Sequence, residues 1–422
     1  MTIPQIITLI IFIVSYLLIF SGKLERTAAA LLGLCAMVAS GYVFGFTNFE
    51  KILLNVDWEV VILLFGMMTY VGVMAKTGFF RYIGVKAVQL SKGRPGYVLL
   101  YLTLITAFVS MVVDNVTTVL LMIPLTIQIA EILKINPVPI ILSEALLSNI
   151  GGVGTLVGDP PNIMIGVASQ FSFNDFIVHL FPPVLLSLLI SLVLSRIVYR
   201  SWLQQKGKNP EKLLDLRPKD YIQDKKKMNY LLIVLVGMIV SFIIGETIGI
   251  PAAFVALTAG VIALLISMED PAEAFKSVEW PTLVFFIALF ALVGGLTQSG
   301  VLTMFAQGIL SIHEDLIIIA LLLLWLSALL SAIVDNIPIT AAFIPVVSVM
   351  AATYHSGLLW WALAMGVGIG GNLTYIGSSA GVITLSVSKR HGHAISTKEW
   401  SRFGIPVGLV SLGVCSLFLF FL

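Results

Sequence analysis

The sequence predicts an all-α polytopic membrane protein made of two inverted repeats, each with five transmembrane helices, one of them broken, and one re-entrant hairpin. Three observations support this fold class. Of the 422 residues, 59% are hydrophobic and 11% are charged, whereas a soluble domain has about a quarter charged residues. Polar and glycine-rich motifs interrupt two apolar stretches of the first half, and both motifs recur in the second half.

The first half covers residues 1–201 and begins with apolar spans over 3–20, 27–46 and 58–75. A basic amphipathic helix over 78–92 is expected at the membrane interface. Residues 97–132 are apolar but are interrupted at Asp114 and Asn115, which predicts a hairpin that enters and leaves by the same face. The last span of this half is predicted over residues 176–199.

Between that hairpin and the last span, residues 139–169 are interrupted by the motif SNIGGVGTLVGDPPN at 148–162. Unpaired backbone groups at membrane depth are tolerated only inside protein or beside a water-filled cavity. We therefore expect a helix with an unwound middle, and a substrate or ion site at the break.

Residues 202–228 are hydrophilic and lysine-rich, and we interpret them as a cytoplasmic linker that serves as a solvated tether. The second half covers residues 229–422, with spans over 229–245, 251–267, 281–298 and 401–422. A second hairpin is predicted over 315–353, with its tip at Asp335 and Asn336, and a second broken helix over 358–389.

The two halves repeat at an offset near 220 residues. The VDN motif at 113–115 precedes Pro124 and returns at 334–336 before Pro345, with the same spacing from aspartate to proline. GGVGTLVG at 151–158 returns as GGNLTYIG at 370–377. An odd number of crossings in each half gives the second copy the opposite orientation, which is typical of alternating-access transporters.

The basic residues give an independent prediction of topology. If both termini lie outside, all 24 lysines and arginines except Lys51 fall in loops on the inner side. This distribution satisfies the positive-inside rule and predicts a multi-pass protein of the cell (inner) membrane. The net charge of +2 gives no reason to expect a nucleic-acid partner.

We expect the hairpin tips to meet the breaks near the membrane midplane. A carboxylate in hydrocarbon costs roughly 2.5–3.5 kcal/mol even on lenient scales, so it usually marks a functional pathway. Asp114 and Asp335 are the expected proton carriers, although each would also serve as the N-cap of the second hairpin leg. Asp159 is either a turn residue or a functional carboxylate, and its counterpart in the second copy is Ser378.

Other polar residues of the spans have structural explanations beside functional ones. Glu144 is either a proton relay or a residue near the interface. Asn149, Asn162 and Asn372 are expected to satisfy freed backbone groups whether or not they touch substrate. No cofactor or metal site is expected, because the five histidines are mostly loop residues and Cys35 and Cys415 lie in apolar spans at opposite ends of the chain.

The motif GGVGTLVGDPPN and the paired VDN tips resemble the ion transporter superfamily, nearest to ArsB arsenite permeases, NhaD sodium/proton antiporters and P-protein-like permeases. The resemblance runs from about Trp58 to the end of the chain. It implies a scaffold part that forms a homodimer and a transport part that moves. It places the following residues at the tips and breaks: Asp114, Asn115, Thr117, Thr118, Thr155, Gly158, Asp159, Asn162, Asp335, Asn336, Thr340, Asn372, Thr374, Ser378 and Ser379.

The related divalent-anion symporters carry Ser-Asn-Thr at the tips, where this chain has Asp-Asn. A carboxylate repels a dicarboxylate, and no lysine or arginine is near either motif in the sequence to balance an anion. The sequence therefore favours proton-coupled efflux of neutral arsenite, or antimonite, by alternating access. The alternative is a Na⁺/H⁺ antiporter, or another ion permease, on the same scaffold.

Other functional classes have weaker support. No HExxH motif and no evident Ser/Lys or Asp/Asp arrangement occurs in the spans, so an intramembrane enzyme is not expected. A passive channel stays open, and uphill flux driven by an H⁺ gradient would separate it from a carrier. A soluble ATPase that docks on the basic linker also stays open, as do the coupling ion and its stoichiometry.

Overall fold

The computed structural model describes residues 1–21, 23–205, 207–301, 304 and 315–422, and all regular elements there are helices. His313 lies outside these residues. Nine of the described helices are long and apolar enough to cross a membrane, as expected for a multi-pass protein. They are α2 (Arg26–Phe44), α4 (Trp58–Lys76), α7 (Asn115–Leu133), α10 (Phe173–Val198), α13 (Lys225–Ile248), α16 (Trp280–Gln298), α18 (Leu316–Ile333), α19 (Asn336–Tyr354) and α22 (Thr397–Phe418).

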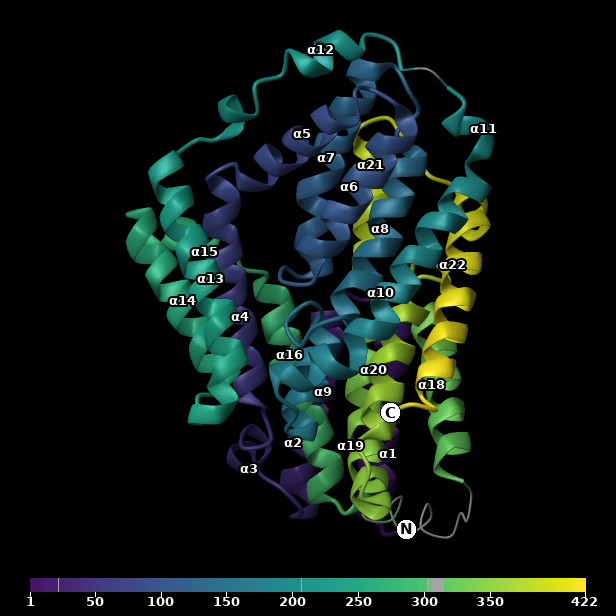
Figure 1. Cartoon of the computed structure of the whole chain (residues 1–422). Helices are drawn as coiled ribbons and strands as arrows, with labels where there is room; N and C mark the ends of the chain where they lie inside the picture. Colours follow the sequence, from purple (N-terminus) through teal and green to yellow (C-terminus); the bar gives the residue numbers. More distant parts are fainter. Residues whose placement is uncertain (22, 206, 302–303, 305–314) are drawn as a thin grey trace.

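Shorter apolar helices complete the bundle: α1 (Ile3–Ser21), α6 (Pro95–Ser110), α8 (Val138–Val153), α14 (Ala252–Ser267) and α20 (Leu358–Gly370). The remaining elements are α3 (Phe49–Leu53), α5 (Phe79–Leu90), α9 (Pro160–Ser169), α11 (Arg200–Leu203), α12 (Pro210–Leu214), the 3₁₀ helix η1 (Pro218–Tyr221), α15 (Pro271–Phe275) and α21 (Ser379–Arg390). The N-terminus and α12 lie at opposite ends of the molecule (Figure 1).

Both predicted hairpins are present. α6 and α7 are joined by residues 111–114, and α18 and α19 by residues 334–335. The α6–α7 hairpin enters the bundle from the end that carries α12, whereas the α18–α19 hairpin enters from the end that carries the N-terminus (Figure 1). Pro124 and Pro345 lie inside the second legs, α7 and α19.

Both predicted broken helices are present too. Residues 154–159 separate α8 from α9, and residues 371–378 separate α20 from α21. Every residue of α8 is buried. A Cβ at Gly151 would lie 2.3 Å from the Ala107 carbonyl oxygen, and one at Gly370 would lie 2.4 Å from that of Ala328. These glycines let each first hairpin leg pack directly on the backbone of its broken helix.

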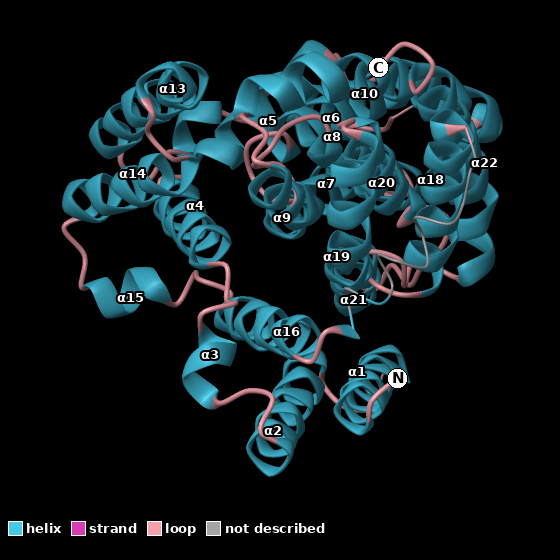
Figure 2. Cartoon of the chain, turned by 90° about the horizontal axis from the view of Figure 1, so that it is seen from below, coloured by secondary structure: helices cyan, strands magenta, loops and turns pink. Residues whose placement is uncertain are grey.

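The helices gather in separate groups when viewed from one end (Figure 2). The hairpins and broken helices pack with α10 and α22, while α4, α13 and α14 form a second group. In the third group, α16 packs on α1, α2 and α3. The Thr27 hydroxyl donates to the Pro281 carbonyl oxygen at 3.0 Å, which fixes the start of α2 against α16.

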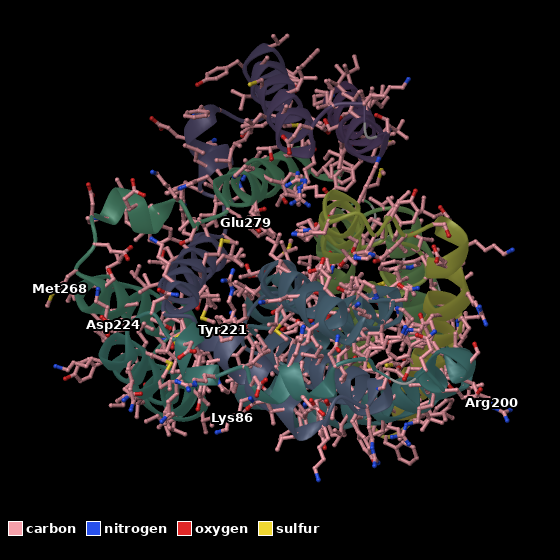
Figure 3. The ribbon with its side chains drawn as sticks, turned by 90° about the horizontal axis from the view of Figure 1, so that it is seen from above. Lys86, Arg200, Tyr221, Asp224, Met268 and Glu279 are labelled. Atoms are coloured by element: carbon pink, nitrogen blue, oxygen red, sulfur yellow. The ribbon has the colours of Figure 1, made fainter. Side chains whose placement is uncertain are left out.

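Most described residues of the linker are exposed or partly exposed, as expected for a solvated segment, but the linker is attached to the bundle at several points. The Trp202 indole donates to the Asn136 carbonyl oxygen at 3.0 Å, and the Gln223 amide donates to that of Thr77 at 2.9 Å. The Leu213 side chain is buried among residues of α5, α6 and α7. Figure 3 shows the linker crossing this end of the molecule from Arg200 to Asp224. Hydrogen bonds and a few apolar side chains provide this attachment, although the linker's composition is hydrophilic.

Candidate functional site

Asp159 lies where the two hairpin tips meet the first break. Its carboxylate is buried and accepts hydrogen bonds from two asparagine side chains, one at each tip. Asn115 Nδ2 lies 3.4 Å from Oδ1, and Asn336 Nδ2 lies 2.9 Å from Oδ2. The predicted tip asparagines therefore converge on one carboxylate, although 177 residues separate Asn336 from Asp159.

A second set of amide contacts links the two breaks. Asn115 Nδ2 also donates to Asn149 Oδ1 at 3.0 Å. Asn149 Nδ2 lies 2.8 Å from both Asn372 Oδ1 and Ser378 Oγ. All four side chains are buried, so these contacts join α7, α8 and the second break without water between them.

Asn162 satisfies freed backbone groups, as expected, whereas the side-chain hydrogen bonds of Asn149 among the described residues all go to other side chains. Asn162 Nδ2 lies 2.8–3.3 Å from the carbonyl oxygens of Gly152, Val153 and Thr155, which the break leaves without helical partners. Asn372 Nδ2 donates to the Leu146 carbonyl oxygen at 3.0 Å. The Asn162 bonds offset the cost of unwound backbone inside the bundle. Leu146 lies inside α8, so the Asn372 bond joins the second break to that helix.

The hydroxyls of the predicted threonines bond either between a break and a hairpin or within one hairpin. Thr155 donates to the Met111 carbonyl oxygen, and Thr374 makes the equivalent contact with that of Ala332. Further hydroxyls bond within their own hairpins, from Thr118 to Val113 O at 3.3 Å and from Thr340 to Asn336 O at 2.8 Å. A Cβ at Gly158 would lie 2.5 Å from the Gly152 carbonyl oxygen, so the glycine is needed for the turn of the first break.

The two tip aspartates have different partners. Asp114 caps α7, and its Oδ1 accepts from the Thr117 amide at 2.8 Å, as expected for an N-cap. Asp335 occupies the same place before α19 but makes no side-chain capping bond. Its Oδ2 instead accepts from Ser379 and from Arg26 Nη1, the latter at 2.7 Å.

Arg26 corrects the sequence analysis, which placed no basic residue near either site. It lies at the start of α2, 309 residues before Asp335 in the chain. It also donates to Ser379 Oγ at 2.9 Å and to Thr282 Oγ1 at 3.3 Å. The sequence analysis looked for basic residues close to the motifs along the chain. Arg26 lies near the beginning of the first half, and only the fold brings it to the second tip.

A small cavity lies between these groups. Its volume is about 10 Å³, close to what a single water molecule needs. Glu279, the N-cap residue of α16, lines the cavity together with residues of the tips and of the broken helices. Figure 3 shows Glu279 toward the middle of the molecule. The polar lining comprises Arg26, Asp114, Asn115, Asp159, Glu279, Thr282, Asn336 and Ser379.

Glu144 does not line this cavity. Its side chain is fully buried between α6, α7 and α8. Thr126 Oγ1 lies 2.8 and 2.9 Å from its two carboxyl oxygens, and Thr106 Oγ1 lies 3.3 Å from Oε1. Burial inside the bundle is compatible with a proton relay, and both alternatives for this residue stay predictions.

No group of three or more His, Cys, Asp or Glu side chains suited to a metal ion occurs among the residues that the structure describes. Asp114 and Asp159 form no ion pair within that part of the chain. The site is therefore a cluster of amides and carboxyls with one guanidinium at its edge.

Comparison with known proteins defines the family. The family model CitMHS, described as "Citrate transporter", matches residues 16–366. The "46 kDa membrane protein" of Mycobacterium leprae is 37% identical over 98% of both chains. The human P protein is 31% identical over 95% of this chain and 58% of its own length.

A solved structure shows the same fold. The YdaH transporter of Alcanivorax borkumensis matches 90% of this chain and 88% of its own with a TM-score of 0.61, at 15% sequence identity. The expected likeness to P-protein-like permeases is confirmed, whereas these comparisons do not support ArsB-type specificity. The chain belongs to the CitMHS citrate transporter family of membrane proteins.

Proposed function

We propose that this chain is a secondary active transporter whose central site binds a small cation, H⁺ or Na⁺, and couples it to transport by alternating access. The observation that carries this proposal is the set of three carboxyls, Asp114, Asp159 and Glu279, around a cavity of about 10 Å³. Asp159 is buried and the other two carboxyls are partly buried. A carboxylate removed from water is costly unless a cation or proton offsets its charge. Arg26 is already paired with Asp335, and among the described residues no other cation pairs with these three carboxyls.

The geometry supports ion transport better than arsenite or antimonite efflux. The sequence argument for neutral cargo rested on carboxylates with no basic residue nearby, and Arg26 removes that premise. A bare cation fits the cavity, and the asparagine and carboxyl oxygens are the ligands that a hard cation prefers. Na⁺/H⁺ antiport therefore becomes the leading version of the proposal.

A carboxylate substrate such as citrate is the second candidate. The family description names citrate, and Arg26 supplies a guanidinium suited to bind a carboxylate. An anion of that size would not enter the cavity as it stands, so the tips and breaks would have to separate. The bound cation would then be the coupling ion, and its charge would offset the repulsion between site carboxylates and substrate.

The same proposal includes the organisation expected from the sequence. Residues 1–201 and 229–422 would be two inverted repeats joined by the cytoplasmic segment 202–228, with both termini outside. A homodimer would form through the scaffold helices. The order of the described helices supports this division, because each half contains a hairpin followed by a broken helix.

Flux in proteoliposomes under imposed H⁺ or Na⁺ gradients tests the proposal. Na⁺-driven H⁺ movement alone would support antiport, whereas gradient-driven citrate accumulation would support the second candidate. Arsenite accumulation that collapses with a protonophore would restore the hypothesis drawn from the sequence. If the substrate moves only down its own gradient, and neither an H⁺ nor a Na⁺ gradient drives its accumulation, the proposal is overturned and a channel is favoured.

A further inference from the structure

The two tip aspartates are equivalent in sequence but not in charge environment. Asp114 has a capping bond and no ion pair within the described residues. Asp335 is paired with Arg26 at 2.7 Å. Arg26 begins α2, the second helix of its half, whereas α14 occupies that place in the other half and begins with alanine at 252. Among the described residues, the tips thus have one ion-paired positive charge, which Arg26 places at the second tip.

Arg26 is held in place from outside the hairpins and breaks. Its Nη2 donates to Thr282 Oγ1 at 3.3 Å, and its guanidinium carbon lies 5.7 Å from the centre of the Phe285 ring. Both residues belong to α16, which also packs on α2. The guanidinium therefore belongs to the α2–α16 group. Asp335 belongs to the second hairpin, and Ser379 begins α21, directly after the second break.

One carboxylate oxygen of Asp335 could still coordinate a cation. Its Oδ2 accepts from Arg26 and Ser379, but its buried Oδ1 has no hydrogen-bond partner among the described residues. A buried carboxylate oxygen of this kind is a good ligand for a small cation. The adjacent guanidinium would repel such a cation, because like charges a few ångströms apart interact strongly where water is excluded.

We propose that Arg26 is a tethered cation that takes the place of a transported one at the second tip, so that the chain binds fewer coupling cations than its two aspartate tips would allow. The inference rests on the proposed cation-coupled function and assigns the coupling ion to the Asp114 and Asp159 side of the site. It makes Arg26 a determinant of transport stoichiometry.

The test is the number of cations per cycle in proteoliposomes, from Na⁺ titrations at fixed pH, H⁺ titrations at fixed Na⁺ and reversal potentials. Arg26→Gln should add one cation per cycle and raise the Hill coefficient for that ion. Arg26→Lys keeps the charge and should keep the wild-type stoichiometry. The double variant Arg26→Gln/Asp335→Asn should also return to it, because the freed carboxylate is removed.

Unchanged stoichiometry in a folded, active Arg26→Gln variant would overturn the inference. If that variant does not fold, Asp335→Asn alone decides: retained stoichiometry supports the inference, and the loss of one cation refutes it. Wild-type protein whose flux depends on neither Na⁺ nor H⁺ would instead refute the proposed function. The two failures are therefore distinguishable.

Discussion

Replacing Asn149 by leucine should destabilise the contact between the two broken helices. The leucine has a similar volume but no amide, so the bonds to Asn115, Asn372 and Ser378 are all lost. Side-chain hydrogen bonds inside membrane proteins contribute about 0.6 kcal/mol each on average. We therefore expect a loss of about 2 kcal/mol in unfolding free energy, together with a large loss of transport.

Unfolding in mixed detergent micelles, followed by tryptophan fluorescence, measures the stability loss, and proteoliposome flux measures transport. Ser148→Ala is the matched control on the same helix, because Ser148 Oγ bonds only one turn back, to the Ala145 carbonyl oxygen at 2.8 Å, among the described residues. Equal stability and flux in Asn149→Leu and in this control would refute the role given to the amide contacts.

Further predictions concern packing, the linker and the cysteines. Gly151→Ala should cost about 1–3 kcal/mol in a thermal or denaturant unfolding assay, because its Cβ would meet backbone, whereas Gly237→Ala, with open space around it, should be neutral or stabilising. Trp202→Ala should lower the unfolding free energy by about 3–5 kcal/mol at most and increase limited proteolysis of the linker. Unchanged cleavage would contradict the attachment of the linker to the bundle. Replacing Cys35 and Cys415 together by serine should leave flux nearly unchanged, since neither lies at the site, and lost flux in folded protein would mean that a thiol takes part.

The fold was largely predictable because its determinants are local. Glycine and polar residues within apolar runs located both breaks, and the VDN motifs located both tips. Repetition at an offset near 220 residues then connected the halves. The attachment of the linker was missed because a few apolar side chains, such as Leu213, decide it within a hydrophilic segment.

The site was only partly predictable. Asn115, Asn336 and Asp159 were all selected from their motifs, and they do lie together. Arg26, Glu279 and Thr282 were missed as site residues. Each lies at or beside the start of a helix, and the sequence around it gives no sign of the distant contact. An arginine between two apolar spans is ordinarily explained by the positive-inside rule, which concealed its second role.

Equilibrium binding of Na⁺ and H⁺ to the purified protein, wild type against Asp159→Asn, tests the central claim most directly. Asp215→Asn, which removes an exposed carboxyl of the linker, is the control. The account predicts cation binding in the wild type and the control, and its loss in a folded Asp159→Asn protein. If the folded Asp159→Asn protein binds cations with the affinity of the wild type, a cation site centred on this carboxylate is contradicted.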